Sequence, residues 1–392
     1  MNLVLSVGLM SRNIIYIHYH LVISDVTEIF VLRGFNCIGL SSKTLSIEVF
    51  DRECTAHQPA WVFSINFSPE IAVLCSRRAI PYVSWTIDPL PLSRQSLAIG
   101  IDPPLCLLFA HDLSTVAKFG LLGVDSRHLL LAAPANRRHP VKVDLTLAPY
   151  RCDASFVGSS LVDEVYALDR WLTPLGGDSL SVRGLSWLSS VMHEAEGAVG
   201  LLCLEAAEGA KALPAFLREL CHTDSDCAEL VAKLNGVVSA FYRQRGVAYM
   251  LRYPGPVAVW GDAGWTDCRP HYRGQADHGD ELTQIYCASA VNLDIPRLYQ
   301  RQTVTMRIFD ILACGGFLLA ERSSAMGAVF TEGVHVAYYD AHERLPEVIE
   351  RWVTDPVGRQ NIAVSGRTEV LAKHQIERRV AVILEAVAQK GW

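Results

Sequence analysis

The sequence lacks the short motifs that would assign an activity directly. Its first apolar run, residues 2–8, ends in a single glycine instead of the Gly-x-Gly-x-x-Gly of dinucleotide-binding folds, which disfavours a two-domain dehydrogenase. It contains no Gly-x-x-x-x-Gly-Lys-Ser/Thr phosphate loop, no Gly-x-Ser-x-Gly nucleophile elbow and no His-Glu-x-x-His zinc motif. These absences argue against a P-loop ATPase, an α/β-hydrolase and a zinc peptidase.

Charges and clusters of metal ligands are scarce as well. Only 19% of the residues are charged, and no run of Lys or Arg is longer than two, which argues against a nucleic-acid-binding protein. The 11 Cys residues form no Cys-x-x-Cys pair. The spacing of Cys221, His222 and Cys227 matches no zinc template, and the carboxylates Asp224 and Asp226 follow no strand. We therefore expect reduced thiols in a cytoplasmic protein, with no metal ion and no cofactor.

Long hydrophobic runs are missing. No apolar stretch reaches the roughly 18 residues that a membrane-spanning helix needs. The start of the chain has no basic residues before its apolar run and no small-residue cleavage site after it, so we expect no signal peptide. The mean hydropathy is slightly positive. This value suits buried parallel strands and also a protein that touches a membrane surface, so peripheral membrane contact stays open.

The chain does contain two series of short apolar runs that alternate with helical patterns. The runs cover residues 61–66, 80–85 and 105–110 in the first series and 152–160, 257–262, 288–295, 315–321 and 335–340 in the second. Strands alternating with helices indicate parallel, doubly wound sheets. Half of the residues are hydrophobic, as large buried cores require. We expect an α/β protein with two Rossmann-like domains that face one another.

A proline-containing break separates the two series. Residues 133–151 contain three prolines and charges of both signs. We expect a first domain over residues 1–140 and a second over residues 151–375. Residues 376–392 have a helical pattern, and this last helix is a candidate for packing back on the first domain.

Polar side chains follow two of the strands predicted in the first domain. Asp88 comes after the run 80–85, and His111 and Asp112 come after the run 105–110. In parallel sheets, the groups just beyond the carboxyl ends of the strands line the ligand crevice. The three residues are therefore candidates for contact with a substrate.

The strongest local feature is the segment 301–321. Thr303 or Thr305 can cap a helix that ends just before the pair Gly315 and Gly316. The free N–H groups and the positive dipole at the amino end of a helix suit a diphosphate. Arg301 and Arg307 can add positive charge. We expect this helix to bind the diphosphate group of a ligand.

Asp310 lies further along the same helix. Its carboxylate can accept hydrogen bonds from both hydroxyls of a ribose, while Gly315 and Gly316 end the helix before a buried strand. The alternative is an ordinary amphipathic helix, in which Arg307 and Asp310 form a surface ion pair and the glycines only cap the helix. The residues by themselves leave both interpretations open.

Two further segments have the composition of a ligand site. Gly158 follows the first strand of the second series and lets the backbone approach a ligand, and Ser159 offers a hydrogen-bond donor. Tyr272 or Arg273, which precede a predicted helix, can stack on a base. The simpler alternatives are a plain turn for the first segment and a solvated loop for the second.

Together these motifs resemble glycosyltransferases of the spore maturation protein CgeB type, a GT-B group related to the group 1 glycosyltransferases. The matching stretches occur in the family's order from about residue 60 to the end: PYVSWTIDPLPL, FAHDLSTVAKFGLLGV, DASFVGSS, VAVWGDAGW, YRGQADHGDELTQIYCASAVNLDI and residues 303–321. The resemblance implies a GT-B fold, with two Rossmann-like domains whose parallel sheets face each other across a cleft. It also implies that the second domain binds a nucleotide sugar and that the first presents the acceptor.

The resemblance extends to individual residues. Asp310 stands where the family usually carries the Glu that holds the ribose, so the charge is kept and the side chain is shorter. The other implied positions are Thr303, Arg307, Gly315 and Gly316 near the diphosphate, Gly158 and Ser159 at the phosphate-side turn, Tyr272, Arg273 and Gly274 beside the base, and Asp88, His111 and Asp112 facing the cleft from the first domain.

The implied reaction moves a sugar from a nucleotide-diphosphate sugar to a glycan, protein or small-molecule acceptor. It needs no metal ion, because helix N–H groups and Arg307 would stabilise the departing diphosphate. An inverting reaction requires a general base, for which Asp88 or Asp112 is a candidate, whereas in a retaining reaction these residues orient the acceptor. A nucleotide-sugar epimerase of the same fold and a catalytically silent nucleotide-sugar-binding protein remain alternatives.

Overall fold

A computed structural model describes residues 12–19, 22–88, 98, 100–134, 137–142, 145–194, 213–220, 222–300 and 303–392. The strand predicted at residues 2–8 lies outside the described residues, as do Arg301 and Cys221. The chain divides into two compact units. One consists of Met1–Pro134 with Gln375–Trp392, and the other of Ala135–His374.

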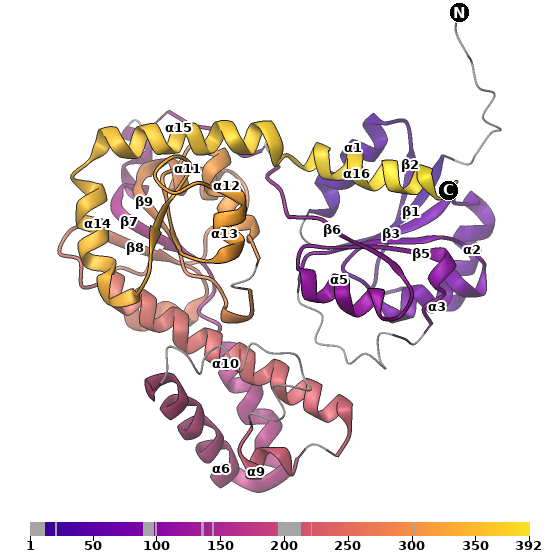
Figure 1. Ribbon diagram of the computed structural model, residues 1–392, viewed down its shortest axis with the longest axis horizontal. Coiled ribbons are helices and arrows are strands. Elements are labelled where there is room, and N and C mark those ends of the chain that lie inside the picture. Colours follow the sequence, from indigo (N-terminus) through magenta and orange to yellow (C-terminus); the bar gives the residue numbers. More distant parts are fainter. Residues whose placement is uncertain are drawn as a thin grey trace, which may run out of the picture. The chain divides into compact units, whose positions relative to one another are not determined.

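The described strands of the first unit form a six-stranded parallel sheet in the order β2-β1-β3-β4-β5-β6 (Figure 1). Their bounds are β1 Asn13–Ile17, β2 Asn36–Leu40, β3 Trp61–Ile65, β4 Tyr82–Thr86, β5 Cys106–Ala110 and β6 Asp125–His128. The three strands predicted between residues 61 and 110 are confirmed as β3, β4 and β5.

Helices cover both faces of this sheet (Figure 1). Their bounds are α1 Ile23–Leu32, α2 Ile47–His57, α3 Pro69–Arg77, α5 Leu113–Gly120 and α16 Ile376–Gln389. On one face, Phe30 of α1 packs edge-on against Trp61 and Phe63 of β3, with ring centroids 5.3 Å apart in both pairs. The other face buries Phe50 of α2 and Phe119 of α5 in a second apolar cluster. The strands are therefore covered on both sides, as parallel sheets require.

The last helix of the chain belongs to the first unit. The backbone N–H of Ile376 donates to the carbonyl of Ala133 at 3.2 Å, and Arg379 Nε donates to the carbonyl of Leu130 at 2.9 Å. Helix α16 also packs against α1. The chain thus leaves the first unit after Pro134 and returns to it at Gln375.

The described strands of the second unit form a five-stranded parallel sheet in the order β11-β10-β9-β7-β8. The strand bounds are β7 Cys152–Val157, β8 Val257–Trp260, β9 Ser289–Asp294, β10 Leu318–Glu321 and β11 Ala337–Tyr339. All five lie within the apolar runs of the second series, so that prediction is confirmed. After β11, a 3-10 turn separates Asp340 from the next α-helix, and the carboxylate of Asp340 accepts from Arg322 Nε at 2.6 Å.

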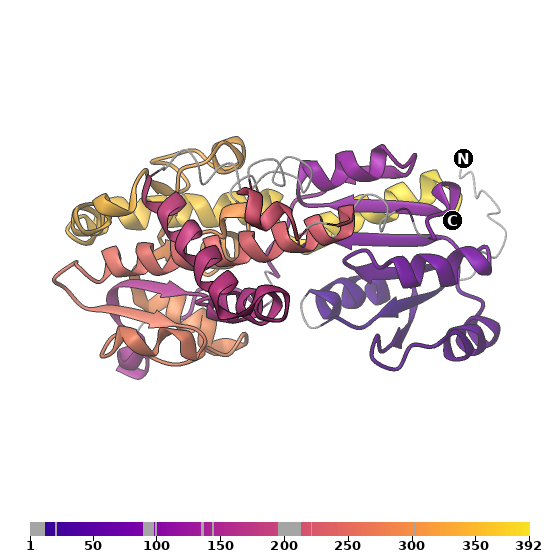
Figure 2. The same ribbon diagram turned by 90° about the horizontal axis from the view of Figure 1, so that it is seen from below.

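The helices of the second unit are α6 Val162–Glu194, α9 Ala215–Arg218, α10 Asp224–Met250, α11 Asp280–Ala288, α12 Met306–Ala313, α13 Ser324–Val329, α14 Leu345–Val353 and α15 Pro356–Lys373. Helices α6 and α10 pack through an apolar cluster that includes Leu168, Leu172, Leu234 and Val237. Figures 1 and 2 show α6 and α9 beside one end of α10, away from the sheet. The described residues between 162 and 250 are therefore mainly helical.

The strand orders define where a ligand crevice forms in each sheet. In the second sheet the chain proceeds from β7 to β8 on one side and from β9 to β11 on the other. In the first sheet it proceeds from β1 to β2 on one side and from β3 to β6 on the other. The strand order thus reverses its direction at one point in each sheet. Ligands of doubly wound sheets bind at this reversal, outside the carboxyl ends of the strands. The expected positions are therefore between β7 and β9 and between β1 and β3.

Candidate functional site

The carboxyl ends of β7 and β9 hold a compact charged cluster. Gly158 follows β7, Asp294 is the last residue of β9, and Arg307 lies in the first turn of α12. Arg307 Nη1 donates to Asp294 Oδ1 at 2.6 Å. A Cβ on Gly158 would lie 2.8 Å from Arg307 Nη2, so the missing side chain lets the guanidinium approach the turn. Two predicted site residues that are distant in sequence, Gly158 and Arg307, thus meet at the expected crevice.

A second arginine, which sequence reasoning missed, supports the same turn. Arg243 of α10 is buried, and its Nη1 donates to the carbonyl of Ser159 at 3.1 Å and to Ser159 Oγ at 3.3 Å. Its Nε donates to the carbonyl of Ile295 at 3.1 Å. The ring of Phe156 lies 5.5 Å from the guanidinium carbon of Arg307 and 5.9 Å from that of Arg243. Both cations are therefore held beside the turn after β7.

The loop after β8 closes the turn from the other side. Asp262 Oδ2 accepts from the backbone N–H of Ser160 at 2.8 Å, and Trp265 Nε1 donates to the carbonyl of Gly158 at 2.7 Å. A Cβ on Gly261 would lie only 2.2 Å from the carbonyl oxygen of Gly158. This close backbone approach explains the glycine at position 261.

The segment predicted beside the base runs next to β8. Tyr272 pairs with Val259 of β8 in a parallel bridge, and Tyr272 Oη donates to the carbonyl of Gly261 at 3.2 Å. Gly274 has a φ of 93°, which favours glycine, and its carbonyl accepts from the backbone N–H of Gly261 at 2.9 Å. Tyr272, Arg273 and Gly274 therefore lie at the same edge of the sheet as the charged cluster.

The amino end of α12 differs from its predicted form in one respect. The helix begins after Thr305, but the side chain of Thr305 makes no capping hydrogen bond. The hydroxyl of Thr303 donates to the carbonyl of Gln300 at 2.9 Å. The prediction that a threonine hydroxyl caps this helix is therefore wrong for both threonines, and the N–H groups of the first turn are not occupied by such a cap.

Asp310 lies inside the second unit and is only 6% exposed. Its Oδ1 lies 3.6 Å from Nε of Arg138, which is equally buried. Arg138 also donates to the carbonyls of Gly279 at 2.9 Å and His278 at 2.6 Å. The alternative of a surface pair between Arg307 and Asp310 is thus wrong. Ribose binding by Asp310 stays a prediction, and sequence periodicity did not indicate its partner.

Gly315 and Gly316 lie at the carboxyl end of α12, opposite to the end that carries Arg307. Gly315 has a φ of 74°, and a Cβ on Gly316 would lie 2.9 Å from Asn292 Nδ2 and from the carbonyl of Tyr286. The glycines therefore end the helix and allow it to pack closely against its neighbours. Among the described residues, neither glycine contacts Gly158, Asp294 or Arg307. Their place near the diphosphate therefore stays a prediction.

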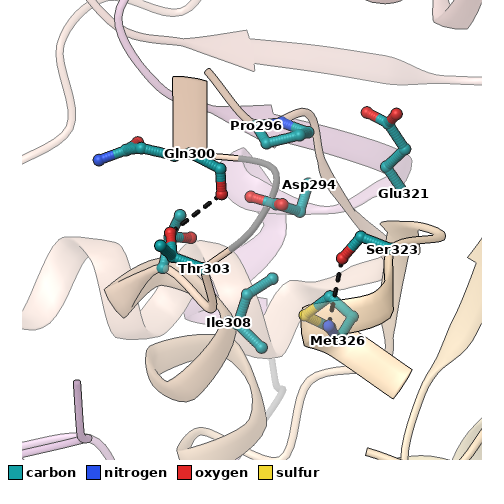
Figure 3. Close-up of a pocket in the computed structure, with 9 residues that line it drawn as sticks. Asp294, Pro296, Gln300, Thr303, Ile308, Glu321, Ser323 and Met326 are labelled. Atoms are coloured by element: carbon teal, nitrogen blue, oxygen red, sulfur yellow. Dashed lines mark hydrogen bonds between the residues drawn. The ribbon is translucent and has the colours of Figure 1, made fainter. Parts of the chain in front are cut away.

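A small pocket lies beside the charged cluster, at the carboxyl ends of β9 and β10 (Figure 3). Two carboxylates, Asp294 and Glu321, line it together with the hydroxyl side chains of Thr303, Thr305 and Ser323. Ser323 Oγ accepts from a backbone N–H at the start of α13 and so caps that helix. Apart from Thr303 and Thr305, none of these residues was singled out from the sequence.

Asp88 lies at the carboxyl edge of the first sheet, as predicted. Its Oδ2 accepts from Tyr19 Oη at 2.5 Å and from Asn66 Nδ2 at 2.9 Å. Tyr19 follows β1 and Asn66 follows β3, so the carboxylate is held at the reversal of the strand order. Asn66 has a φ of 59° and also accepts from the backbone N–H of Asp88 at 3.0 Å. Sequence reasoning found Asp88 and missed the two residues that hold it.

His111 and Asp112 have structural roles at the end of β5. His111 is buried, its Nδ1 lies 3.3 Å from the carbonyl of Thr86, and burial lowers the pKa of its imidazole. Asp112 caps α5, and its Oδ1 accepts from the backbone N–H of Thr115 at 2.7 Å. Burial raises the pKa of Asp112, but hydrogen bonds from Thr115 and Ser114 outweigh it and leave the pKa below its usual value.

The residues that the structure describes include no group of three or more His, Cys, Asp or Glu placed to hold a metal ion. Asp226 belongs to a capping box with Thr223 at the start of α10, so its carboxylate has a structural role. None of the described helices is both long and apolar enough to span a membrane.

The chain is similar to known glycosyltransferases. Residues 238–385 match the family model described as glycosyl transferase-like. HepE of Anabaena, in a crystal structure with UDP and glucose, has a TM-score of 0.56 at 9% identity, covering 96% of this chain and 99% of that chain. A glycosyltransferase of Rickettsia africae and sucrose-phosphate synthase of Thermosynechococcus elongatus each have a TM-score of 0.53 at 10% identity, covering 96% of this chain and 98% of those chains. No curated protein sequence matches the chain.

At these identities, the structural similarity shows the fold. It confirms the predicted α/β architecture of the GT-B kind, with two Rossmann-like domains built on parallel sheets. The family match supplies the enzyme class. The chain is a glycosyltransferase with the GT-B fold, and the match to the glycosyl transferase-like model is limited to residues 238–385.

Proposed function

We propose that the chain transfers a sugar from a nucleotide-diphosphate sugar to an acceptor, and that the donor diphosphate binds between the carboxyl ends of β7 and β9. The observation that carries the proposal is the position of Arg307, in the first turn of α12 and beside the Gly158 turn, at the reversal of the strand order. HepE, which shares the fold, was crystallised with UDP and glucose, which favours a UDP-sugar as the donor.

Charge at this crevice fits the departure of a diphosphate. Arg307 and Arg243 flank the turn after β7, and the first N–H groups of α12 carry no threonine cap. Preorganised donors aimed at the oxygens where negative charge develops lower the barrier to such a departure. In this proposal these cations and N–H groups stabilise the leaving group without a metal ion.

The remaining contacts follow from the same placement. Tyr272, Arg273 and Gly274 lie beside the base, because they extend along β8 at the edge that carries Gly158. Asp310 holds the ribose. On the acceptor side, Asp88 is the stronger candidate for a general base, since its carboxylate is partly exposed whereas Asp112 caps a helix and His111 is buried.

We also propose that the chain is of the CgeB type and acts in the cytoplasm. The stretches DASFVGSS and VAVWGDAGW, which carry part of the resemblance, form the turn after β7 and the loop that packs on it. The stretch over residues 303–321 supplies Arg307 and Asp310. The motifs of this type thus contribute to one edge of the second sheet.

We expect at least one nucleoside diphosphate to raise the melting temperature of the protein. In differential scanning fluorimetry with UDP, GDP, ADP and the corresponding sugars, a ligand at about 100 times its Kd adds about 2.7 kcal/mol to the free energy of unfolding. Because the proposed site uses Arg307 and helix N–H groups, excess EDTA should leave the shift unchanged. Absence of a shift with every nucleotide would argue for a protein that does not use this donor class.

Release of nucleoside diphosphate only when an acceptor is added would distinguish transfer from epimerisation.

A further inference from the structure

One buried arginine connects the two helices that flank the proposed nucleoside contacts. Arg138 is only 6% exposed, and its guanidinium donates to the carbonyls of Gly279 at 2.9 Å and His278 at 2.6 Å, just before α11. Its Nη1 also donates to Oγ1 of Thr283, inside α11, at 3.2 Å. The remaining nitrogen, Nε, lies 3.6 Å from Oδ1 of Asp310 in α12. The two Nη atoms thus bind α11 and the residues before it, and Nε is directed to the carboxylate.

We propose that Arg138 is a positioning residue for the donor nucleotide. It holds the carboxylate of Asp310 in the orientation that accepts hydrogen bonds from the ribose hydroxyls, so that the enzyme selects ribonucleotides over deoxyribonucleotides. Arg138 itself does not touch the ligand and acts through Asp310. The inference rests on the proposed function and adds to it the residue on which recognition of the ribose depends.

The position of Asp310 on α12 fits a ribose next to the proposed diphosphate site. Asp310 follows Arg307 by three residues, so the two side chains are neighbours on successive turns of the helix. Tyr286 of α11 is buried beside them, and its phenol interacts electrostatically with both residues and with Arg138. One helical turn rises about 5.4 Å, which suits two adjoining groups of one ligand. A nucleotide whose diphosphate binds at Arg307 therefore has its ribose within reach of Asp310.

The other contacts of Arg138 lie near the segment proposed to bind the base. His278 comes four residues after Gly274, the last residue of that segment. The hydrogen bonds to α11 and to the residues before it fix the plane of the guanidinium, so that Nε is presented to Asp310 in one orientation. Burial of a carboxylate is costly unless a positive group lies nearby, and Arg138 supplies that group. A carboxylate held in advance binds more tightly than one that must be ordered by the ligand.

The test compares two nucleotides that differ only at the 2′ hydroxyl. Calorimetric Kd values are measured for UDP and 2′-deoxy-UDP with the wild-type protein, Arg138→Met and Arg138→Lys. GDP or ADP and its 2′-deoxy form replace them if that nucleotide stabilises the protein more. We expect the wild-type protein to bind the ribonucleotide at least about tenfold more tightly, the effect of a hydrogen bond to a charged acceptor.

The variants should lose this preference. In Arg138→Met the ratio of the two Kd values should fall to about threefold or less, and in Arg138→Lys it should lie between that value and the wild-type ratio. Arg138→Lys keeps a positive charge for Asp310, so the comparison can be made even if Arg138→Met does not fold. Asp310→Asn should lose the preference as well, because Arg138 acts through this carboxylate.

Arg367→Met is the matched control. Nε of Arg367 also donates to a carbonyl of α12, that of Ala313 at 3.2 Å, but at the end of the helix opposite to Arg307. This variant should keep the wild-type ratio even if its melting temperature falls. Equal binding of both nucleotides by the wild-type protein, or a wild-type ratio in a folded Arg138 variant, would overturn the inference and leave the proposed function standing. If no nucleotide binds at all, the proposed function fails and this inference falls with it.

Discussion

Replacing Arg307 with alanine is expected to lower kcat/KM for sugar transfer about 100- to 1,000-fold, the effect of removing one preorganised donor from a developing negative charge. Arg307 lies at the amino end of α12 and against the Gly158 turn, where the departing diphosphate is proposed to lie. The rate is measured as release of nucleoside diphosphate, with the acceptor that supports turnover or with water as a slow acceptor. The Kd of the nucleotide should rise in parallel.

Two variants separate this effect from a loss of structure. Arg307→Ala removes the partner of the buried Asp294, so its melting temperature must be measured alongside the rate. Arg307→Lys keeps the charge and loses the two-pronged geometry, and it should recover part of the rate. Arg344→Ala removes an exposed arginine that pairs with the exposed Glu347, and it should change neither the rate nor the melting temperature. Wild-type kinetics in a folded Arg307→Ala protein would contradict the assignment.

Replacing Asp310 with alanine is expected to lower the free energy of unfolding of the second unit by about 3–5 kcal/mol, because it leaves the guanidinium of Arg138 buried without its carboxylate partner. Chemical denaturation or calorimetry measures this change. The double variant Arg138→Met with Asp310→Leu removes both charges together. It should cost clearly less than the sum of the two single changes, since neither charge is then left unpaired.

The proposed contact with ribose adds a binding effect to this stability effect. Asp310→Asn keeps the shape of the side chain and removes its charge, so we expect a weaker nucleotide Kd in this variant. Asp88→Ala, in the first unit, should change the nucleotide Kd by about twofold or less. If Asp88→Ala weakens nucleotide binding more than Asp310→Asn, the donor site has been assigned to the wrong unit. If Asp310→Asn changes stability only, Asp310 contributes to folding and not to nucleotide binding.

The sequence predicts features that depend on neighbouring residues. The runs that became β3, β4 and β5 are short and apolar, and helices follow β3 and β5, which is enough to indicate a parallel sheet. Ser68 before Pro69 predicts the start of α3, and the hydroxyl of Ser68 indeed accepts from the backbone N–H of Ile71. Gly315 likewise marks the end of α12, because its φ of 74° favours glycine.

Features that depend on distant partners were not predictable in this way. Arg243 holds the turn at Ser159, which is 84 residues away in the sequence, and no periodicity connects the two. Arg138 lies in the proline-containing segment between the two series, where nothing indicates that its side chain would be buried against Asp310. Arg243 stands beside Gln244 and Arg245 in α10, so no local signal distinguishes it as the arginine whose side chain is buried.

Neither the position after a strand nor the residue type separates the candidates of the first sheet. Asp88 and His111 both follow strands of the first sheet, and histidine is the commoner catalytic residue. In the structure, the ring of His111 is buried against the carbonyl of Thr86, whereas Asp88 stays partly exposed at the reversal of the strand order. The order of the strands, which the sequence does not contain explicitly, separates the two.

A crystal structure of the protein with UDP-glucose, or with the sugar nucleotide that stabilises it most, tests the central claim most directly. The account predicts that the diphosphate lies within hydrogen-bond distance of Arg307 and of the backbone at Gly158 and Ser159. A diphosphate bound at the first sheet near Asp88, or anywhere away from Arg307, would contradict it.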